Sequence, residues 1–304
     1  MPSLVTPQPC ALCGALARDS VFEITRARSE GSQAFRLVRC CFCELVMTEP
    51  QLSTPDLEAF YGQDYWGRMN PDDPAWVQRD QRHKTAFLNR FRRDGRVLDV
   101  GCGMGLFLLA LDPARWDRYG LEAMPVPLAE AVKRLGPERI VQGELLTAGL
   151  PRGQFDVVTF WDVLEHLPNP RQALEETFRL LRPGGVVLLT LPNFSSYQAR
   201  RFRQDWYALS LPHHLYHFTP QTLIRMLEGA GFRMLALADR FGGENYHAFK
   251  HSLLNQLTRR HGARGGRLRY YLRKPFLRPW EWLTTRLGGG SHLAAAALRP
   301  PSTR

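Results

Sequence analysis

The sequence lacks a long apolar run and has very little lysine. No stretch of its 304 residues approaches the roughly 18 consecutive apolar residues of a membrane-spanning helix. The first residues show no signal-peptide pattern, so we expect a cytoplasmic protein. The only lysines are Lys84, Lys133, Lys250 and Lys274, and genome composition also produces such a bias toward arginine. The net charge of +11 is therefore weak support for a nucleic-acid partner.

Cysteine is also scarce, but four of the six cysteines form two C-x-x-C pairs. Each pair can turn two thiolates toward one point, and four thiolates complete a tetrahedral zinc shell. Two short predicted strands, 21–24 and 35–38, lie between the pairs, which is the layout of a zinc ribbon. A pair of disulfides is the alternative, but no secretion signal indicates an oxidising compartment. The sequence predicts a zinc ribbon over residues 1–48 with four Zn²⁺ ligands: Cys10, Cys13, Cys40 and Cys43.

The role of this ribbon is open at the level of sequence. A module this small lacks a core, so the metal could simply hold it folded. It could also bind RNA or frame an acceptor pocket. Cys41 offers an alternative chelate with Cys43, at a less favourable spacing, and Cys102 is expected to be a small packing residue.

A strand–turn–helix stretch from Val97 to Leu111 organises the rest of the chain. Three of its first four residues are apolar, as in a buried parallel strand, and the fourth is Asp99. A turn without β-carbons then lets a ligand lie against the backbone, with the N–H groups of the helix start directed at it. The G-x-G-x-G spacing differs from the dinucleotide pattern G-x-G-x-x-G, and a carboxylate before the turn suits a cationic amine better than a pyrophosphate. The predicted ligand cradle consists of Asp99, Gly101, Gly103 and Gly105.

Acidic residues follow the next predicted strands at positions that suit a bound nucleoside. Glu122 ends a strand about 20 residues beyond the turn, where an acid can accept hydrogen bonds from ribose hydroxyls. Glu144 follows a third strand and is a candidate contact for an adenine amine.

The segment 162–167, after a buried strand at 155–161, supports two interpretations. Asp162 and Glu165 have the spacing of a capping box that starts a single turn. Alternatively, Asp162 or His166 lies beside the reacting centre. The two interpretations are compatible.

A long segment, 192–218, leaves the carboxyl end of a predicted strand at 186–191 and is rich in aromatic residues and histidine. Ligands of parallel sheets bind at that edge, and long loops there are more often functional than idle. A hydroxyl or acidic-carbon acceptor needs a base, and histidine is the usual one near neutral pH. We predict His214 as the base, with His166 as the second candidate.

Two further segments mix aromatic residues with other signals. Residues 49–84 form a predicted linker that either packs on the next domain or closes over a ligand. Residues of about 250–290 form a basic insertion, in which nine Arg or Lys between Arg259 and Leu287 accompany one acid, Glu281. Interleaved Arg, Trp and Leu over residues 264–287 suit a membrane surface or a nucleic acid. A solvated helical face is the alternative. The linker aromatics are Phe60, Tyr61, Tyr65 and Trp66.

Taken together, these motifs resemble the seven-strand, Rossmann-like S-adenosylmethionine-dependent methyltransferases over roughly residues 85 to 300. The ribbon and the stretch 206–219 resemble a subgroup with an N-terminal zinc ribbon, many of whose members are linked to methylation of sugars, cell-surface glycans or other small molecules. Glu44 departs from the glycine that is usual in ribbon knuckles. The resemblance implies a doubly wound α/β sheet of order 3-2-1-4-5-7-6 within residues 85–304, with the last strand antiparallel and S-adenosylmethionine as cofactor.

The sequence therefore favours a methyltransferase acting on a small-molecule, sugar or glycan-precursor acceptor. One alternative is an RNA methyltransferase that uses the ribbon and the arginine-rich insertion. Another is a non-catalytic binding protein with a vestigial donor site, which the intact Asp99, glycine turn and Glu122 argue against. Peripheral membrane contact through residues 264–287 is a separate hypothesis. Neither the methylated atom (O, N or C) nor the oligomeric state has a signature in the sequence.

Overall fold

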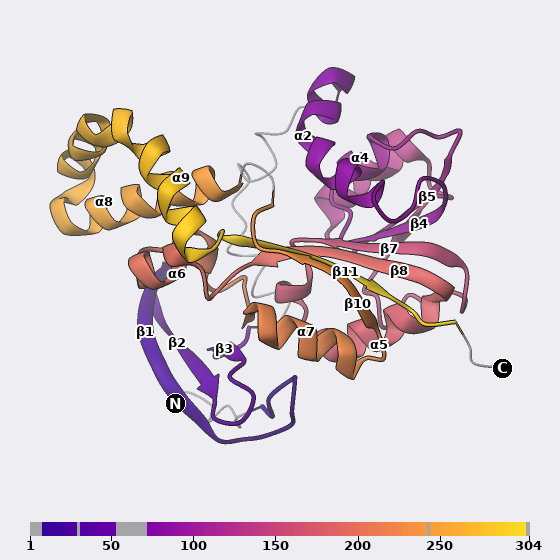
Figure 1. Ribbon diagram of the computed structural model, residues 1–304, viewed down its shortest axis with the longest axis horizontal. Helices are drawn as coiled ribbons and strands as arrows, with labels where there is room; N and C mark the ends of the chain where they lie inside the picture. The colour runs from indigo at the N-terminus through magenta and orange to yellow at the C-terminus, as the bar shows by residue number, and fades with distance from the viewer. Residues whose placement is uncertain (1–7, 29–30, 53–71, 242–243, 302–304) are drawn as a thin grey trace. The chain divides into compact units, whose positions relative to one another are not determined.

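The computed structural model describes residues 8–28, 31–52, 72–241 and 244–301, so the aromatic cluster expected at positions 60–66 lies outside the described residues (Figure 1). The chain folds as two compact units that are interleaved in the sequence. The ribbon unit comprises Met1–Phe60, Leu191–Arg225 and Ala238–Ala294, and the sheet unit comprises Tyr61–Thr190, Met226–Leu237 and Ala295–Arg304. Among the described helices, none combines the length and the apolar character needed to cross a bilayer.

A seven-stranded sheet forms the centre of the sheet unit, in the order β10-β11-β8-β7-β4-β5-β6. Numbered along the chain within this sheet, that order is the 3-2-1-4-5-7-6 arrangement that the family resemblance implies. The strands are β4 (Gly95–Val100), β5 (Trp116–Glu122), β6 (Ile140–Gln142), β7 (Phe155–Trp161), β8 (Leu181–Pro192), β10 (Arg233–Ala238) and β11 (His292–Leu298).

Strands β4, β5, β6, β7 and β8 are parallel, and β11 runs against them. The N–H of Gly184, near the start of β8, donates to the carbonyl of Arg299, just after β11. At the other end of β8, the N–H of Asn193 donates to the carbonyl of Ser291, which precedes β11. The start of one strand therefore pairs with the end of the other, which makes the last strand antiparallel, as expected.

Helices cover both faces of this sheet, because the central strands are apolar on both sides. Figure 1 shows α2 (Pro74–Leu88) and α4 (Pro125–Leu135) on one face and α5 (Pro170–Leu180) on the other. Helix α2 begins at a cap, where the carboxylate of Asp73 accepts the N–H groups of Ala75 and Trp76. A further helix of this chain is α7 (Pro220–Gly229).

The ribbon unit contains an antiparallel sheet of order β1-β2-β3-β9. Strands β1 (Arg18–Arg28) and β2 (Gly31–Cys40) are longer than the two predicted strands. They are joined by β3 (Val46–Glu49) and by β9 (Tyr216–His217), a pair of residues from the histidine-rich segment.

The core of the ribbon is completed by residues from outside positions 1–48. Phe35 and Leu37 of β2 are fully buried in a cluster with Trp206, Phe249 and Leu257. These partners come from the segment after β8 and from the helix at residues 244–273. Residues distant in sequence therefore supply the core that the ribbon's own residues could not. The remaining elements of this unit are α6 (Tyr197–Phe202), the 3-10 turns η3 (Arg203–Asp205), η4 (Tyr207–Leu209) and η5 (Lys274–Phe276), α8 (Glu244–Arg273) and α9 (Leu277–Gly288).

Candidate functional site

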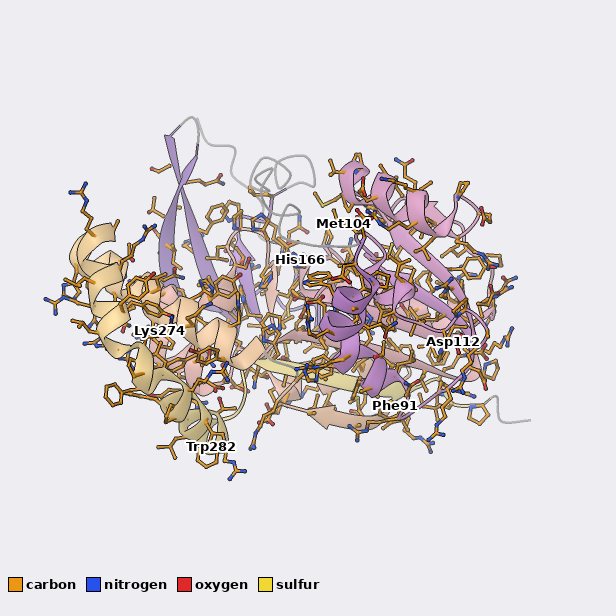
Figure 2. The ribbon with its side chains drawn as sticks, turned by 90° about the horizontal axis from the view of Figure 1, so that it is seen from above. Phe91, Met104, Asp112, His166, Lys274 and Trp282 are labelled. Atoms are coloured by element: carbon orange, nitrogen blue, oxygen red, sulfur yellow. The ribbon has the colours of Figure 1, made fainter. Side chains whose placement is uncertain are left out.

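The carboxyl edge of the seven-stranded sheet brings together the predicted cofactor residues. The glycine turn follows β4, Glu122 ends β5, Glu144 follows β6 and Asp162 follows β7. Because these strands are parallel neighbours, their carboxyl ends lie at the same edge. Figure 2 labels two residues of this edge, Met104 in the glycine turn and His166 in the turn after β7.

The glycine turn has a backbone shape that other residues adopt only with strain. Gly101, Gly103 and Gly105 have φ values of 65°, 56° and 76°, in the left-handed region. A β-carbon on Gly101 would lie 2.8 Å from the side chain of Val163, while the residue itself is exposed. The turn is thus pinned on its inner side and open on its outer side, which is the form a ligand cradle requires.

Three N–H groups of the glycine turn form hydrogen bonds within the chain. Those of Gly101 and Cys102 donate to the carbonyl of Leu121 at 2.8 Å and 3.1 Å, and that of Gly105 donates to the carbonyl of Cys102. The helix that follows, α3 (Leu106–Leu109), is a single short turn. The N–H groups predicted to face a ligand are those of the helix start, and these three bonds do not involve them. The bonds of Gly101 and Cys102 fix the turn to the end of β5.

Asp99 is a buried carboxyl group without a cation beside it. It is 2% exposed, and its Oδ1 accepts a hydrogen bond of 2.6 Å from the hydroxyl of Thr159 on β7. Burial raises the pKa of Asp99 to about 7, although the hydroxyl of Thr159 and the charge of Lys84 oppose this. Among the described residues no Arg, Lys or His nitrogen lies within 4.0 Å of it. A cationic group bound here would compensate the buried charge.

Glu122 is held against the glycine turn by backbone donors. Its Oε2 accepts the N–H of Gly103 and its Oε1 accepts the N–H of Met124, both at 2.8 Å. Burial raises the pKa of Glu122, and these two N–H groups oppose the shift. Each carboxylate oxygen keeps a second lone pair, so the predicted role with ribose hydroxyls is chemically compatible with this anchoring.

The segment after β7 does not form the predicted capping box. The 3-10 turn η2 (Leu164–His166) is preceded by Val163 and has no side-chain cap, while Asp162 has a left-handed φ of 59°. Glu165 is 1% exposed with no hydrogen-bond partner among the described residues, and burial raises its pKa well above the ordinary value. The spacing from Asp162 predicts Glu165 as part of a cap. Nothing in its spacing revealed this burial.

The other predicted site residues are in varied surroundings. Glu144 is exposed in the loop after β6, and His166 is half-buried. His214, in the ribbon unit, is buried, and its Nδ1 lies 3.0 Å from the carbonyl oxygen of Ala208. Since a carbonyl only accepts, Nδ1 carries the proton and Nε2 carries the lone pair that a base needs.

His217 has a structural role in this segment. Burial lowers its pKa to about 3, so the ring is neutral. The hydroxyl of Thr48 donates to the carbonyl of His214 at 2.8 Å and lies 3.0 Å from Nε2 of His217, which must then be the donor to that hydroxyl. These bonds fix β9 beside β3 and hold the chain from His214 to His217.

The four predicted zinc ligands converge as expected. Their sulfur atoms all lie within 4.8 Å of one another, with 3.4 Å between Cys10 and Cys43 and 3.5 Å between Cys13 and Cys40. Zn–S bonds of about 2.3 Å in a tetrahedron require sulfur–sulfur distances of roughly 3.8 Å, so the cluster fits a zinc ion. The observed distances are far longer than a disulfide bond of about 2.05 Å.

The two cysteine knuckles have the same backbone form. The N–H of Gly14 donates to the carbonyl of Cys10, and the N–H of Glu44 donates to the carbonyl of Cys40. Both closing residues are left-handed, with φ values of 76° and 65°. Glu44 therefore adopts the conformation that glycine has in the first knuckle, at the cost that a β-carbon adds there.

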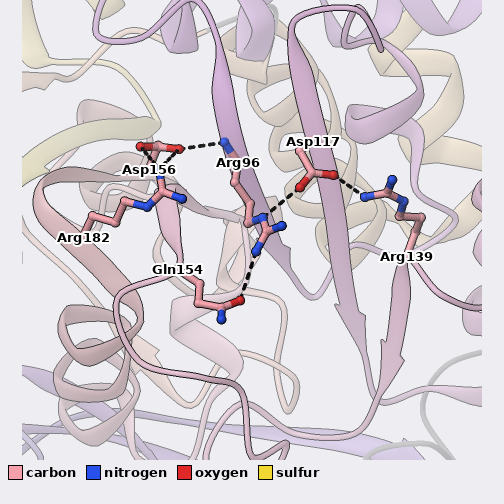
Figure 3. Close-up of polar contacts among 6 residues, drawn as sticks. All are labelled: Arg96, Asp117, Arg139, Gln154, Asp156 and Arg182. Atoms are coloured by element: carbon pink, nitrogen blue, oxygen red, sulfur yellow. Dashed lines mark hydrogen bonds and ion pairs between the residues drawn. The ribbon is translucent and has the colours of Figure 1, made fainter.

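The opposite, amino edge of the sheet is a network of ion pairs. Nε of Arg96 donates to Asp117 at 2.8 Å, and Arg139 pairs with the same carboxylate (Figure 3). Asp156 accepts the backbone N–H of Arg96 at 2.8 Å and pairs with Arg182 at 3.1 Å. These acids begin the strands whose far ends form the candidate site.

Known proteins share this fold and parts of this sequence. The profile of a family described as "Methyltransferase domain" matches residues 75–237, more than half of the chain. The chain belongs to this methyltransferase family. A protein named "Probable S-adenosylmethionine-dependent methyltransferase" from Mycolicibacterium smegmatis is 33% identical over 186 residues, which cover 60% of this chain and 67% of that protein.

Two further likenesses qualify what the family membership means for this methyltransferase. The ubiquinone biosynthesis O-methyltransferase of Coxiella burnetii is 24% identical over 225 residues, covering 68% of this chain and 92% of that protein. The solved structure of the cyclase SpnF matches with a TM-score of 0.52 and 20% identity, covering 78% of this chain and 84% of that one. That likeness concerns the fold alone, and a cyclase on the same fold shows that the fold does not fix the reaction.

The observed edge fits the cofactor of a methyltransferase. S-adenosylmethionine carries an amino group, a sulfonium and a ribose. The site offers a buried carboxyl group without a cation at Asp99 and an anchored carboxylate at Glu122. The chain is an S-adenosylmethionine-dependent enzyme by family. The contacts with S-adenosylmethionine stay predictions. They are assigned to Asp99, the glycine turn, Glu122, Glu144 and Asp162.

Proposed function

We propose that this methyltransferase methylates a hydroxyl group of a small-molecule, sugar or glycan-precursor acceptor. The observation that carries the proposal is the tautomer of His214, whose Nδ1 proton is held by the carbonyl of Ala208. A hydroxyl must lose its proton to become a good nucleophile, whereas a neutral amine already has its lone pair. A buried histidine with its lone pair fixed on Nε2 is the group that a hydroxyl acceptor requires.

On the donor side, this chain's residues bind and orient. S-adenosylmethionine, when bound, supplies a methyl group already activated by its sulfonium. Asp99 would pair with the cationic amine, and Glu122 would accept the ribose hydroxyls. The glycine turn would lie against the nucleoside. Alignment and exclusion of water then do most of the catalysis, since the donor is reactive by itself.

On the acceptor side, Nε2 of His214 takes the hydroxyl proton as the new bond forms. Thr48 and His217 fix the backbone around His214, so the ring keeps one orientation. His166 is the second candidate for the base. The relative from Coxiella burnetii is named as an O-methyltransferase, which supports the choice of a hydroxyl acceptor.

The test uses His214→Asn, because an amide N–H can still donate to the carbonyl of Ala208 but cannot act as a base. We expect donor binding by calorimetry to be unchanged and turnover to fall about 10²- to 10⁴-fold. Isotope-labelled donor and mass spectrometry on a panel of phenols, sugars and amines identify the methylated atom. His166→Asn is measured in parallel, and His83→Asn, exposed on α2, is the control.

Two outcomes contradict the proposal. Products methylated only on nitrogen would remove the hydroxyl acceptor, and a His214→Asn variant with full turnover would remove the base. A loss confined to His166→Asn would keep the hydroxyl acceptor and transfer the role of base to His166.

We also propose that the four cysteines bind one structural Zn²⁺ ion. Metal analysis of the purified chain should find one zinc per chain, and Cys40→Ser should abolish it. Cys41→Ser is the matched control, because Cys41 is exposed and outside the cluster. Full zinc content in Cys40→Ser, or none in the wild type, would contradict the assignment.

A further inference from the structure

A helical insertion in the ribbon unit, residues 264–286, carries a surface that the proposed function does not use. Helix α8 is interrupted at Gly262, where φ is 71° and ψ is 170°, and continues through η5 into α9. One side of the insertion is anchored, because Tyr270 and Leu277 are buried in the cluster around Trp206 and Phe249. It is therefore a folded part of the unit, with an inner and an outer side.

The outer side is apolar to an unusual degree. Seven of the thirteen exposed large apolar residues in the described part of the chain fall within 268–283, with exposed fractions between 49% and 70%. Trp280 and Trp282 are both more than half exposed. Isolated surface hydrophobics are ordinary, but a group of this size marks an interaction site. The seven residues are Leu268, Tyr271, Leu272, Phe276, Trp280, Trp282 and Leu283.

The same side is strongly basic. Seven Arg or Lys residues accompany one acid, Glu281, and all seven are exposed. Within the described residues none of the seven lies within 4.0 Å of a carboxylate, although Arg286 stacks 4.4 Å from the ring centre of Trp282. Lys274 and Trp282 are labelled along this stretch in Figure 2. The cations are Arg264, Arg267, Arg269, Arg273, Lys274, Arg278 and Arg286.

We propose that this insertion docks on an anionic membrane surface. Trp and Tyr favour the boundary between headgroups and acyl chains, and basic residues around them are attracted to anionic lipid. The charge of the surface is complementary to that partner, with six more cations than acids. Exposed Leu268, Leu272 and Leu283 favour lipid over nucleic acid, since aliphatic side chains do not stack on bases.

The test measures co-sedimentation of the full chain with vesicles of phosphatidylcholine alone and with an equal part of phosphatidylglycerol. We expect binding to the anionic vesicles only, weakened by salt, with a blue shift of tryptophan fluorescence. Trp280→Ser with Trp282→Ser should weaken binding about tenfold and remove the shift. Arg267→Glu, Arg269→Glu and Lys274→Glu together should weaken it by about a hundredfold.

Matched controls change the same chemistry elsewhere. Val126→Ser with Leu146→Ser removes exposed apolar residues outside the insertion, and Arg225→Glu with Arg233→Glu reverses exposed charges there. Neither should alter vesicle binding. Circular dichroism and the thermal midpoint confirm that every variant folds, as expected for substitutions at exposed positions.

Three results would overturn the proposal. One is wild-type protein that ignores anionic vesicles or binds neutral ones equally. Another is binding that the controls weaken as much as the insertion variants do. The third is salt-sensitive binding of single-stranded RNA, or self-association, that the tryptophan variant abolishes while vesicle binding persists unchanged.

Discussion

The two edges of the seven-stranded sheet treat their acidic residues in opposite ways. At the amino edge, although burial opposes it, Arg96 and Arg139 lower the pKa of Asp117. At the carboxyl edge, burial raises the pKa of Asp99 to about 7 and also raises that of Glu122. The described cations lie more than 4.0 Å from both of these acids. Arginines of the chain pair with Asp117 at the amino edge, whereas Asp99 and Glu122 at the carboxyl edge have no such ion pair among the described residues.

This difference separates stability from function on the same strands. Asp99 and Arg96 both belong to β4, each one residue from an end of the strand. No described cation lies within 4.0 Å of Asp99, whereas Arg96 has hydrogen bonds to two acids, Asp117 and Asp156. A buried carboxylate without a cation costs free energy, so its presence needs a reason outside the fold. Under the proposed function, that reason is a cationic donor.

We expect the largest change in donor affinity for Asp99→Asn. The amide preserves the volume and can still contact Thr159, but it removes the charge that a cationic amine needs. Donor affinity should fall by about 3 kcal/mol, roughly a hundredfold, with no loss of thermal stability. Asp117→Asn, the same change at the amino edge, should instead lower stability and leave donor affinity intact. Calorimetry measures donor affinity and thermal unfolding measures stability. If both variants change both quantities equally, the two edges do not differ in the way proposed.

A second expected difference concerns the glycines at the two edges. Gly101→Ala adds left-handed strain and a collision with the branched side chain of Val163, so it should destabilise by about 2 kcal/mol and weaken donor binding. Gly184→Ala, at the start of β8, adds the strain alone, because nothing lies within 4 Å of its β-carbon. It should cost about 1 kcal/mol and spare binding. Chemical denaturation measures both, and normal donor affinity in Gly101→Ala would contradict the cradle.

A smaller effect is expected for Glu122→Gln. The amide keeps one acceptor oxygen, so one of the N–H groups of Gly103 and Met124 loses its partner. Donor affinity should fall by about 1.5 kcal/mol, roughly tenfold. Glu138→Gln, an exposed change in the loop before β6, is the control. If Glu122→Gln binds the donor like the wild type, the acid has only a structural role.

The sequence was sufficient where local pattern decides the structure. The buried run predicted as a strand at 155–161 is β7. The strand order came through the family resemblance. The turn motif and the spacing of Glu122 beyond it point to Asp99, the glycine turn and Glu122, which lie at the ends of β4 and β5. The domain bounds 1–48, 49–84 and 85–304 stay predictions.

What the sequence could not supply depends on contacts between distant residues. Val46 of β3 pairs with His217 of β9, far along the chain, and this pairing has no local signal. Burial of Glu165 is equally invisible, since its spacing fitted a capping box. The sequence does not predict the helices of the basic insertion, because its arginine and aromatic residues do not repeat at helical spacing.

The most direct test of the central claim is the proton balance of donor binding. With its pKa at about 7 in the free protein, Asp99 is partly protonated near neutrality, and a cationic amine should draw it into the ionised form. Affinity should therefore rise with pH up to about 7 and level off above it, with a proton released on binding at lower pH. Calorimetry in two buffers of different ionisation enthalpy, on the wild type and Asp99→Asn, measures this release. We predict that donor binding releases a proton in the wild type and not in Asp99→Asn. Wild-type binding that is independent of pH and releases no proton would contradict a cationic contact at Asp99.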